Sequence, residues 1–202
     1  MNTRNIFKQA LRVRNKLSSY KNLMKLRLLG INHGRNCTIH GHLSIKLSGN
    51  SELTIGDNFY YSSGRSINPL CSNREGCICV NDGARICIGN NVGMSSTILW
   101  AHKSIVIGDN VKIGGCVTIL DSDAHSLNWE KRRNVDEDSA CKRDAAVIIE
   151  DDVLVGMNTL ILKGVTIGAR SIIGAGSVVT KNIPADCIAA GNPCKVLKYY
   201  NC

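Results

Sequence analysis

The sequence predicts an all-β protein folded as a parallel β-helix, and two regularities carry this prediction. Between residues 149 and 183 an aliphatic residue returns at every sixth position, and a small or β-branched residue follows each one four positions later. Neither an α-helix, with its period of 3.6, nor an ordinary strand, with its period of two, requires a strict period of six. A coil built from hexapeptides does require it. The leading series is Ile149, Val155, Ile161, Ile167, Ile173 and Val179, and the following series is Val153, Thr159, Val165, Ser171, Ser177 and Ile183.

Corner residues recur behind the leading aliphatic positions. Gly156, Gly168 and Gly174 each follow one of them directly, and Asp152 and Asn158 stand close behind. Glycine, asparagine and aspartate tolerate the backbone angles of a tight corner. The repeat therefore predicts short strands joined by regular corners.

The same register continues upstream at Ile107, Ile113 and Ile119 but is absent from residues 121–146. That stretch is polar, highly charged and without an aliphatic period, so we expect a loop ejected from the coil. Loops of this length in compact domains are usually functional or disordered. Before residue 107 the repeat is irregular, and residues 60–76 are predicted to form a second insertion.

The first 35 residues carry nine Lys or Arg and no acidic residue, whereas the rest of the chain carries sixteen of each sign. Their apolar residues have helical spacing, and Ser18-Ser19 are expected to divide the segment into two helices by capping the second. Two interpretations remain open. The apolar stripe covers the first open coil, or residues 1–30 form an interfacial helix attracted to anionic lipid.

These patterns predict three parts: a basic helical cap at 1–35, a β-helix domain at 36–198 with the loop inserted, and a tail at 199–202. Helices are expected only near the termini. A nucleic-acid partner is not expected, because no recognised motif is present and no aromatic residues alternate with the basic ones.

The sequence predicts a cytoplasmic protein, with residues 1–30 as a peripheral contact to the inner face of the membrane. No segment approaches transmembrane length, and no signal peptide is recognised. The ten cysteines form no C-x-x-C pair, so free thiols in a reducing compartment are expected.

His125 is the candidate catalytic base. It opens the long loop directly after a regular coil, where a neutral imidazole can accept a proton from a hydroxyl or an amine. Asp123 stands two positions before it, and on an extended segment the two side chains would face the same side. The carboxylate would then orient the ring and stabilise the imidazolium. The alternative is a surface histidine in a polar loop.

The repeats, the loop with His125, and the closing sequence IGAGSVVTKNIPADCIAAGNPCKVLK resemble the hexapeptide-repeat acyltransferases. The most similar branch is that of the galactoside and maltose O-acetyltransferase-like enzymes, which also serve capsule and O-antigen synthesis. The resemblance covers residues 78–198. It implies a left-handed β-helix with three strands per coil, a homotrimer with active sites between subunits, and acetyl-CoA as acyl donor.

The resemblance also implies the positions that bind this co-substrate. Clustered lysines suit the doubly charged 3′-phosphate as point charges, although each could simply be a solvated residue of the C-terminal cap. The implied positions are Gly156, Met157 and Ala175 for the pantetheine arm, Thr180 and Lys181 for the nucleotide end, and Lys195 and Lys198 for the phosphates.

Two departures from the family pattern concern the substrates. Leu154 stands where many relatives have an aromatic residue, and Met157 replaces a common serine. Ser95 corresponds best to an asparagine that touches the acceptor in related sugar acetyltransferases. Trp100 and His102 are further candidates for a sugar site, because flat rings pack on pyranose faces, or else they serve ordinary packing.

The function expected is transfer of acetyl from acetyl-CoA to a hydroxyl of a sugar or polysaccharide precursor, with His125 as general base at a subunit interface. The alternatives are N-acetylation of an amino sugar and a non-catalytic β-helix scaffold. A zinc lyase on a similar coil would need three converging histidines. Only His102 and His125 are well placed, so no metal is expected.

Overall fold

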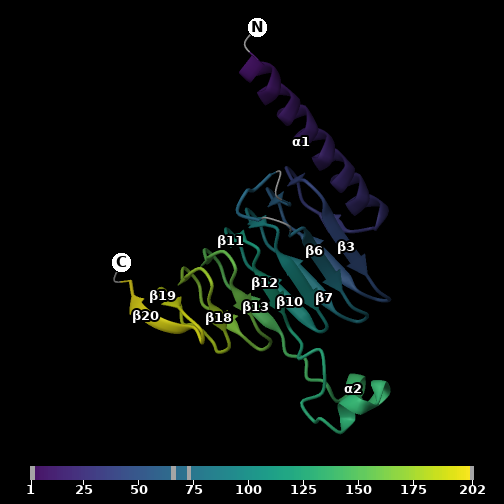
Figure 1. The fold of residues 1–202 in the computed structure, drawn as a ribbon, viewed down its shortest axis with the longest axis vertical. Coiled ribbons are helices and arrows are strands. Elements are labelled where there is room, and N and C mark those ends of the chain that lie inside the picture. Colours follow the sequence, from purple (N-terminus) through teal and green to yellow (C-terminus); the bar gives the residue numbers. More distant parts are fainter. Residues whose placement is uncertain (1–2, 65–66, 72–73, 201–202) are drawn as a thin grey trace.

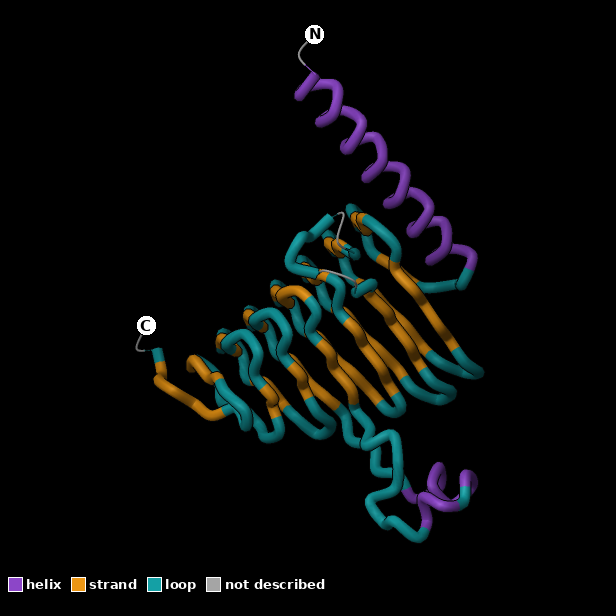
Figure 2. Tube along the Cα trace, viewed as in Figure 1, coloured by secondary structure: helices purple, strands orange, loops and turns teal. Residues whose placement is uncertain are grey.

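The computed structural model describes residues 3–64, 67–71 and 74–200. The chain visits three sheets in turn, so that each strand from β1 to β15 pairs in parallel with the third strand after it. The result is a three-sided stack of coils (Figures 1 and 2). The predicted β architecture with parallel strands is confirmed.

The strands are divided among three sheets, A, B and C. Sheet A contains β1 (Asn32–His33), β4 (Glu52–Ile55), β7 (Arg85–Ile88), β10 (Ser104–Ile107), β13 (Val147–Ile149) and β16 (Thr166–Ile167). Sheet B contains β2 (Thr38–His40), β5 (Tyr60–Ser62), β8 (Gly93–Ser95), β11 (Lys112–Gly115), β14 (Leu154–Val155), β17 (Ile172–Ile173), β19 (Cys187–Ala190) and β20 (Lys195–Tyr199). Sheet C contains β3 (Leu43–Leu47), β6 (Gly76–Val80), β9 (Ile98–Ala101), β12 (Thr118–Leu120), β15 (Leu160–Ile161) and β18 (Val178–Val179).

The two residue series of the hexapeptide pattern fill the interior, as predicted. All six leading aliphatic residues are fully buried, and the following series is at most 4% exposed. Its polar members satisfy their hydroxyls within the corner: Ser171 and Ser177 each donate to a glycine carbonyl at 2.6 Å, from Gly168 and Gly174. Burial of these hydroxyls therefore leaves no unpaired group.

The corner between sheets A and B is the most regular feature of the fold. One residue in each coil adopts a positive φ of 56° to 60° there. Asparagine and aspartate tolerate this left-handed conformation better than other non-glycine residues. The residues are Asn36, Asn58, Asn91, Asn110, Asp152, Arg170 and Asp186.

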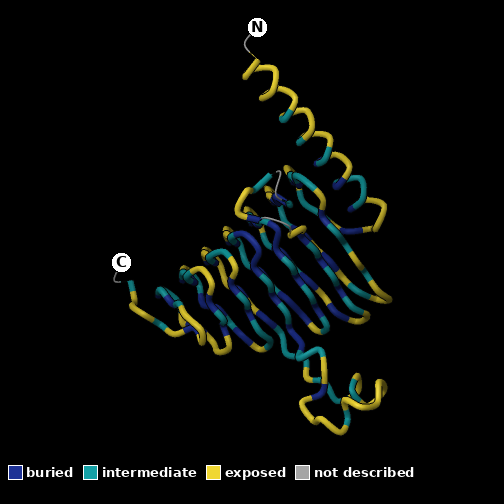
Figure 3. The backbone as a smooth tube through the Cα atoms, viewed as in Figure 1, coloured by how far each residue is buried: buried dark blue, intermediate teal, exposed yellow. Residues whose placement is uncertain are grey.

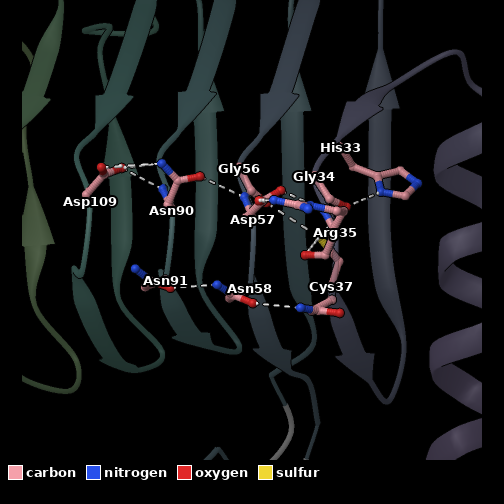
Figure 4. A network of polar contacts seen from close by, with 11 residues as sticks. His33, Gly34, Arg35, Cys37, Gly56, Asp57, Asn58, Asn90, Asn91 and Asp109 are labelled. Carbon is pink, nitrogen blue, oxygen red and sulfur yellow. Dashed lines mark hydrogen bonds and ion pairs between the residues drawn. The ribbon is translucent and has the colours of Figure 1, made fainter.

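The corner asparagines form a ladder along the stack (Figure 4). Figure 4 shows Asn58 donating to the side-chain oxygen of Asn91, at 2.9 Å. Asn91 in turn donates to the side-chain oxygen of Asn110 at the same distance. Two positions before Asn58, Gly56 lies so close to the next coil that a Cβ atom would come 2.6 Å from the backbone carbon of Gly89. The glycine is required by the close stacking of the coils.

The predicted loop at 121–146 leaves the coil between β12 and β13 and projects from the stack (Figure 1). It contains a 3₁₀ turn, Lys131–Arg133, and α2, Val135–Cys141, so the prediction that helices lie only near the termini is wrong. Asn134 caps α2 by accepting from the backbone N–H groups of Asp136 and Glu137. The predicted second insertion is shorter than expected, since β5 ends at Ser62 and β6 begins at Gly76.

The N-terminal helix α1, Thr3–Leu28, is continuous, so the predicted break at Ser18-Ser19 is wrong. These serines instead bind the outer edge of β2. Ser19 Oγ accepts from the N–H of Ile39, and Asn22 donates to the carbonyls of Ile39 and Gly41. The helix covers the first coil through these polar side chains together with Leu26, which is fully buried in the core, and Leu23, which packs against it.

Beyond α1, strand β1 already pairs with β4 at Asn32–His33. At the other end, β20 returns antiparallel along β19 and ends at Tyr199. Of the predicted tail, residues 201–202 lie outside the described residues.

The corner geometry gives a first testable prediction, with Asn91 as the probe. Replacing it with alanine or with glycine removes the same two ladder hydrogen bonds, but only alanine must adopt the unfavourable φ. We expect Asn91→Ala to be less stable than Asn91→Gly by about 1 kcal/mol, as measured by thermal and denaturant unfolding. Equal stabilities would show that the left-handed corner imposes no such constraint.

Candidate functional site

The ring of His125 is held by a carboxylate from the same loop. Its Nδ1 atom lies 2.6 Å from Oδ2 of Asp138, and the other oxygen of Asp138 accepts from the N–H of Ser126 at 2.6 Å. The side chain of His125 is 70% exposed, whereas that of Asp138 is 15% exposed. An ionised carboxylate only accepts hydrogen bonds, so the Nδ1 atom carries the proton and Nε2 keeps its lone pair.

The charge state of Asp138 follows from these contacts. The hydrogen bond from His125 and then that from the backbone of Ser126 lower its pKa below the ordinary value, against a smaller opposing effect of burial. The contact is therefore present at neutral pH and is lost only when acid protonates this carboxylate. At neutral pH the ionised carboxylate of Asp138 therefore faces the Nδ1 side of the ring and fixes its orientation.

Asp123, the partner expected from the sequence, lies elsewhere. Its carboxylate pairs with Lys163 at 3.4 Å, and its N–H donates to the carbonyl of Arg143. The expectation assumed an extended segment, but Ala124 between the two residues has a φ of +63°. This turn sends the side chains of Asp123 and His125 in different directions, and Asp138 takes the position beside the ring.

Asp138 is positioned by the internal structure of the loop. Asp138 lies in the first turn of α2, and Asn134 caps the N-terminus of this helix. On the other side, Arg132 donates to the carbonyl of Ser126 at 2.7 Å, and Arg133 lies 4.5 Å above the ring of Trp129. The only signal for this arrangement in the sequence was an asparagine followed by acidic residues, the pattern of a helix start.

His102 lies at the base of the loop, after β9. Its Nδ1 atom accepts a hydrogen bond from Lys142, and its ring packs edge-on against Trp100 at 4.9 Å. Burial, followed by the charge of Lys142, lowers the pKa of His102 below its ordinary value. The ring is thus neutral at physiological pH, and it anchors the returning strand of the loop to the coil.

The backbone at the same corner is fixed by Asp121, which is fully buried. Its two oxygens accept from the N–H groups of His102, Lys103 and Ser104 at 2.6 to 2.8 Å. The loop therefore begins from a rigid corner.

Ser95, the candidate for acceptor binding, is occupied by the second insertion. Its hydroxyl lies 2.7 Å from the amide nitrogen of Asn68 and 2.9 Å from the hydroxyl of Ser62, and the thiol of Cys71 lies 3.5 Å away. For Ser95 to bind an acceptor, one of these neighbours would have to give up its hydrogen bond.

The positions implied for the co-substrate fall into two corners. Gly156, Met157 and Ala175 follow strands of sheet B, at its corner with sheet C. Thr180 and Lys181 follow β18, at the corner of sheet C with sheet A, where both are exposed. At Gly156 a Cβ atom would lie 2.4 Å from the backbone nitrogen of Ala175, so coil stacking alone already requires glycine there.

Lys195 and Lys198 lie on β20, and both are exposed. They pair in register with Ala190 and Ile188 of β19, which continues sheet B beyond β17. The two lysines are therefore near the C-terminal end of the stack.

The loop with His125 leaves sheet C at its corner with sheet A, whereas Met157 and Ala175 lie at its corner with sheet B. Within one chain, the width of sheet C separates the roots of these two groups. Within the residues that the structure describes, no cluster of three or more His, Cys, Asp or Glu side chains is arranged to hold a metal ion.

Comparison with known proteins identifies the repeat. Residues 146–181 match the family "Bacterial transferase hexapeptide (six repeats)". Galactoside O-acetyltransferase of Escherichia coli (strain K12) is 40% identical over 121 residues, which are 59% of this chain and 56% of that protein. The chain therefore spans about half the length of this relative.

Two further matches cover a smaller and a larger share of the chain. A 2,3,4,5-tetrahydropyridine-2,6-dicarboxylate N-acetyltransferase of Staphylococcus aureus (strain Newman) is 56% identical over 52 residues, 26% of this chain and 22% of that protein. The structure of a galactoside acetyltransferase in complex with coenzyme A superimposes with a TM-score of 0.55 and 27% identity, covering 84% of this chain and 65% of the other. These matches confirm the resemblance expected from the sequence: residues 146–181 match bacterial transferase hexapeptide repeats, and the chain is similar to the hexapeptide-repeat acyltransferases, galactoside O-acetyltransferase among them.

Proposed function

We propose that this protein transfers an acetyl group from acetyl-CoA to a hydroxyl of a sugar or polysaccharide precursor. The observation that carries the proposal is the exposed His125 ring, fixed by Asp138 in the tautomer of a general base. The similarity to a galactoside O-acetyltransferase, and to a structure of such an enzyme with coenzyme A, supports this choice of acceptor and donor.

Acetyl-CoA supplies the acyl group as an activated thioester. His125 Nε2 removes the proton of the acceptor hydroxyl while its oxygen attacks the thioester carbonyl carbon. The carbon–sulfur bond then breaks, and the imidazolium returns the proton to the departing thiolate, so that the products are the acetyl ester and free CoA thiol. Asp138 stabilises the imidazolium between these two transfers. A backbone N–H of the coil facing His125 stabilises the oxyanion.

The separation of the two corners supports a site shared between subunits. Within one chain His125 and the pantetheine positions Gly156, Met157 and Ala175 belong to opposite edges of sheet C. In the proposed homotrimer of left-handed β-helices, the loop of one subunit approaches the co-substrate positions of its neighbour. Thr180, Lys181, Lys195 and Lys198 are then available to the nucleotide and phosphates, and all four are exposed.

The outer face of sheet C supports an association of this kind. From the second coil onward its outward positions are almost all apolar and half-buried, whereas solvent-facing positions of a monomer are usually polar. These positions are Cys77, Cys79, Ile98, Trp100, Thr118, Leu120, Leu160 and Val178.

The acceptor is proposed to bind near the base of the loop. Trp100 lies at the end of β9 with its ring against His102, and a flat ring at this place suits a pyranose face. His102 contributes as a neutral ring held by Lys142. Ser95 can bind the acceptor only if it gives up its hydrogen bond with Asn68 or Ser62 and forms one with the substrate instead.

N-acetylation of an amino sugar is the second candidate, because one relative is an N-acetyltransferase. The same base and donor serve both reactions, so a matched pair of hexose and aminohexose acceptors distinguishes them. A non-catalytic scaffold would bind no CoA. The reduced thiols agree with a cytoplasmic location, since the nine cysteines within the described residues are all free.

Substitution of His125 tests the proposed base. In a thiol-release assay with acetyl-CoA and a panel of sugars, we expect His125→Ala to lower kcat by about 10²–10⁴-fold. Binding of coenzyme A, measured by calorimetry, should remain, because the residue does not hold the co-substrate. A rate close to that of the unmodified protein would remove His125 from the mechanism.

Asp138 is tested as a positioning residue. Asp138→Asn keeps the size of the side chain but removes the charge that fixes the tautomer, and we expect kcat to fall by about 10²-fold with little change in KM for acetyl-CoA. The matched control is Asp136→Asn on the same helix, which should keep both kcat and KM. Equal effects of the two substitutions would reduce the role of Asp138 to helix stability.

Assembly is tested on sheet C. Leu160→Glu places a charge in the middle of the apolar face, so we expect the trimer to dissociate and activity to fall with it. Sedimentation velocity measures the mass, and circular dichroism checks that the coils remain folded. A folded Leu160→Glu trimer would show that this face lies outside the subunit contact.

A further inference from the structure

Helix α1 contacts the coils through one face, on which polar Ser19 and Asn22 bind the first coil and Leu26 enters the core. Its buried residues are Ser19, Asn22 and Leu26, and all of them lie in its C-terminal half. The N-terminal half extends beyond the stack, as Figure 1 shows, and Figure 3 shows it to be largely exposed. The contact of the helix with the coils is therefore concentrated in its C-terminal half.

The opposite face of α1 carries an apolar stripe. Its residues recur at intervals of four and three positions, and five of them are 48% to 82% exposed. At 3.6 residues per turn this stripe lies about 180° from Asn22, on the side that faces away from the coils. The stripe is Ile6, Ala10, Val13, Leu17, Tyr20, Met24 and Leu28, of which Ala10 is exposed and Met24 half-buried.

Basic residues border this stripe on both sides. Lys16 and Arg27 lie on one flank and Lys21 on the other, each within about 100° of its centre. Lys25, next to Lys21, instead donates to the carbonyl of Leu43 on the coil. The whole helix contains eight Lys or Arg and no acidic residue. An apolar stripe between two basic flanks is the pattern of a helix that lies in the plane of a membrane surface.

A second copy of the chain is the competing occupant, because intervals of four and three also suit a coiled coil. Two α1 helices packed along this stripe would bring their basic flanks together with no acidic residue to pair with them. Anionic lipid headgroups complement the flanks instead. None of the described helices is long and apolar enough to cross a bilayer.

We propose that α1 holds the protein on an anionic lipid surface, with the stripe from Ile6 to Leu28 among the acyl chains and its lysines and arginines at the headgroup phosphates. Ser19 and Asn22 keep the other face on β2, so the lipid contact and the contact with the coils exist together. This proposal is independent of the acyl transfer and holds for a protein of any acceptor specificity.

Co-sedimentation of the full-length protein with vesicles tests it. We expect binding to vesicles that contain phosphatidylglycerol, little binding to phosphatidylcholine alone, and loss of binding at about 0.5 M salt, where charges are screened within a few ångström. The double substitution Val13→Ser/Leu17→Ser leaves the charge unchanged and should weaken binding about tenfold or more. The matched control is Val135→Ser in α2, an 84% exposed apolar residue outside α1, which should bind like the unmodified protein.

Melting temperatures of all variants show whether the fold is kept. Binding of the double variant at the level of the unmodified protein would overturn the proposal, as would equal binding to neutral vesicles. A protein that binds no vesicle but loses a self-association in the double variant would identify the stripe as a contact between copies and would likewise overturn it.

Discussion

Every coil of this protein must turn a corner at which one residue adopts a φ near +57°, and the stack depends on that corner. Most side chains resist this conformation, and the cost is limited because asparagine or aspartate stands at every such corner except that of Arg170. Asn58, Asn91 and Asn110 also bind one another from coil to coil, which keeps successive corners in register. With the register fixed, each leading aliphatic residue lies in the interior, next to its counterpart in the following coil. The hydrophobic core is thus a consequence of the corner as much as of the aliphatic period.

The rigid coil leaves little room for chemistry, and the candidate site accordingly lies in a segment that departs from the repeat. The loop at 121–146 does not depend on the coil for its internal order, because Asn134 caps its helix and Asp138 binds both His125 and Ser126. Its attachment is equally well defined through Asp121 and His102. A regular scaffold and a self-ordered loop can therefore hold a histidine in one orientation while most of its ring stays open to solvent.

The sequence predicted the coils well because burial in a narrow stack is read directly from a period of six. Both the leading and the following series proved buried, and the ejected loop lies between β12 and β13 as expected. Contacts within irregular segments could not be predicted in this way. Asp138 lies thirteen positions from His125, and their pairing depends on a turn at Ala124 and on a short helix. Spacing alone favoured Asp123, since spacing describes only regular backbone.

The N-terminal helix shows a second limit of pattern reading. Its apolar spacing was visible, but the sequence did not reveal which face would meet the coils. The structure shows that Ser19 and Asn22 make this contact, because the edge of β2 presents unpaired backbone groups that only polar side chains can satisfy. Leu26 and Leu23 pack on the core beside them, but the longer apolar stripe from Ile6 to Leu28 is left on the outside.

The two ends of the stack have a consequence for solubility. A column of parallel strands is geometrically a short piece of a filament, because its first and last coils offer the same pairing groups that join the coils between them. Here Ser19 and Asn22 occupy the first of these surfaces, and at the last the chain folds back on itself through β20. Sheet B therefore presents no bare parallel strand of the repeat at either end, and this arrangement opposes end-to-end pairing of identical molecules through that sheet.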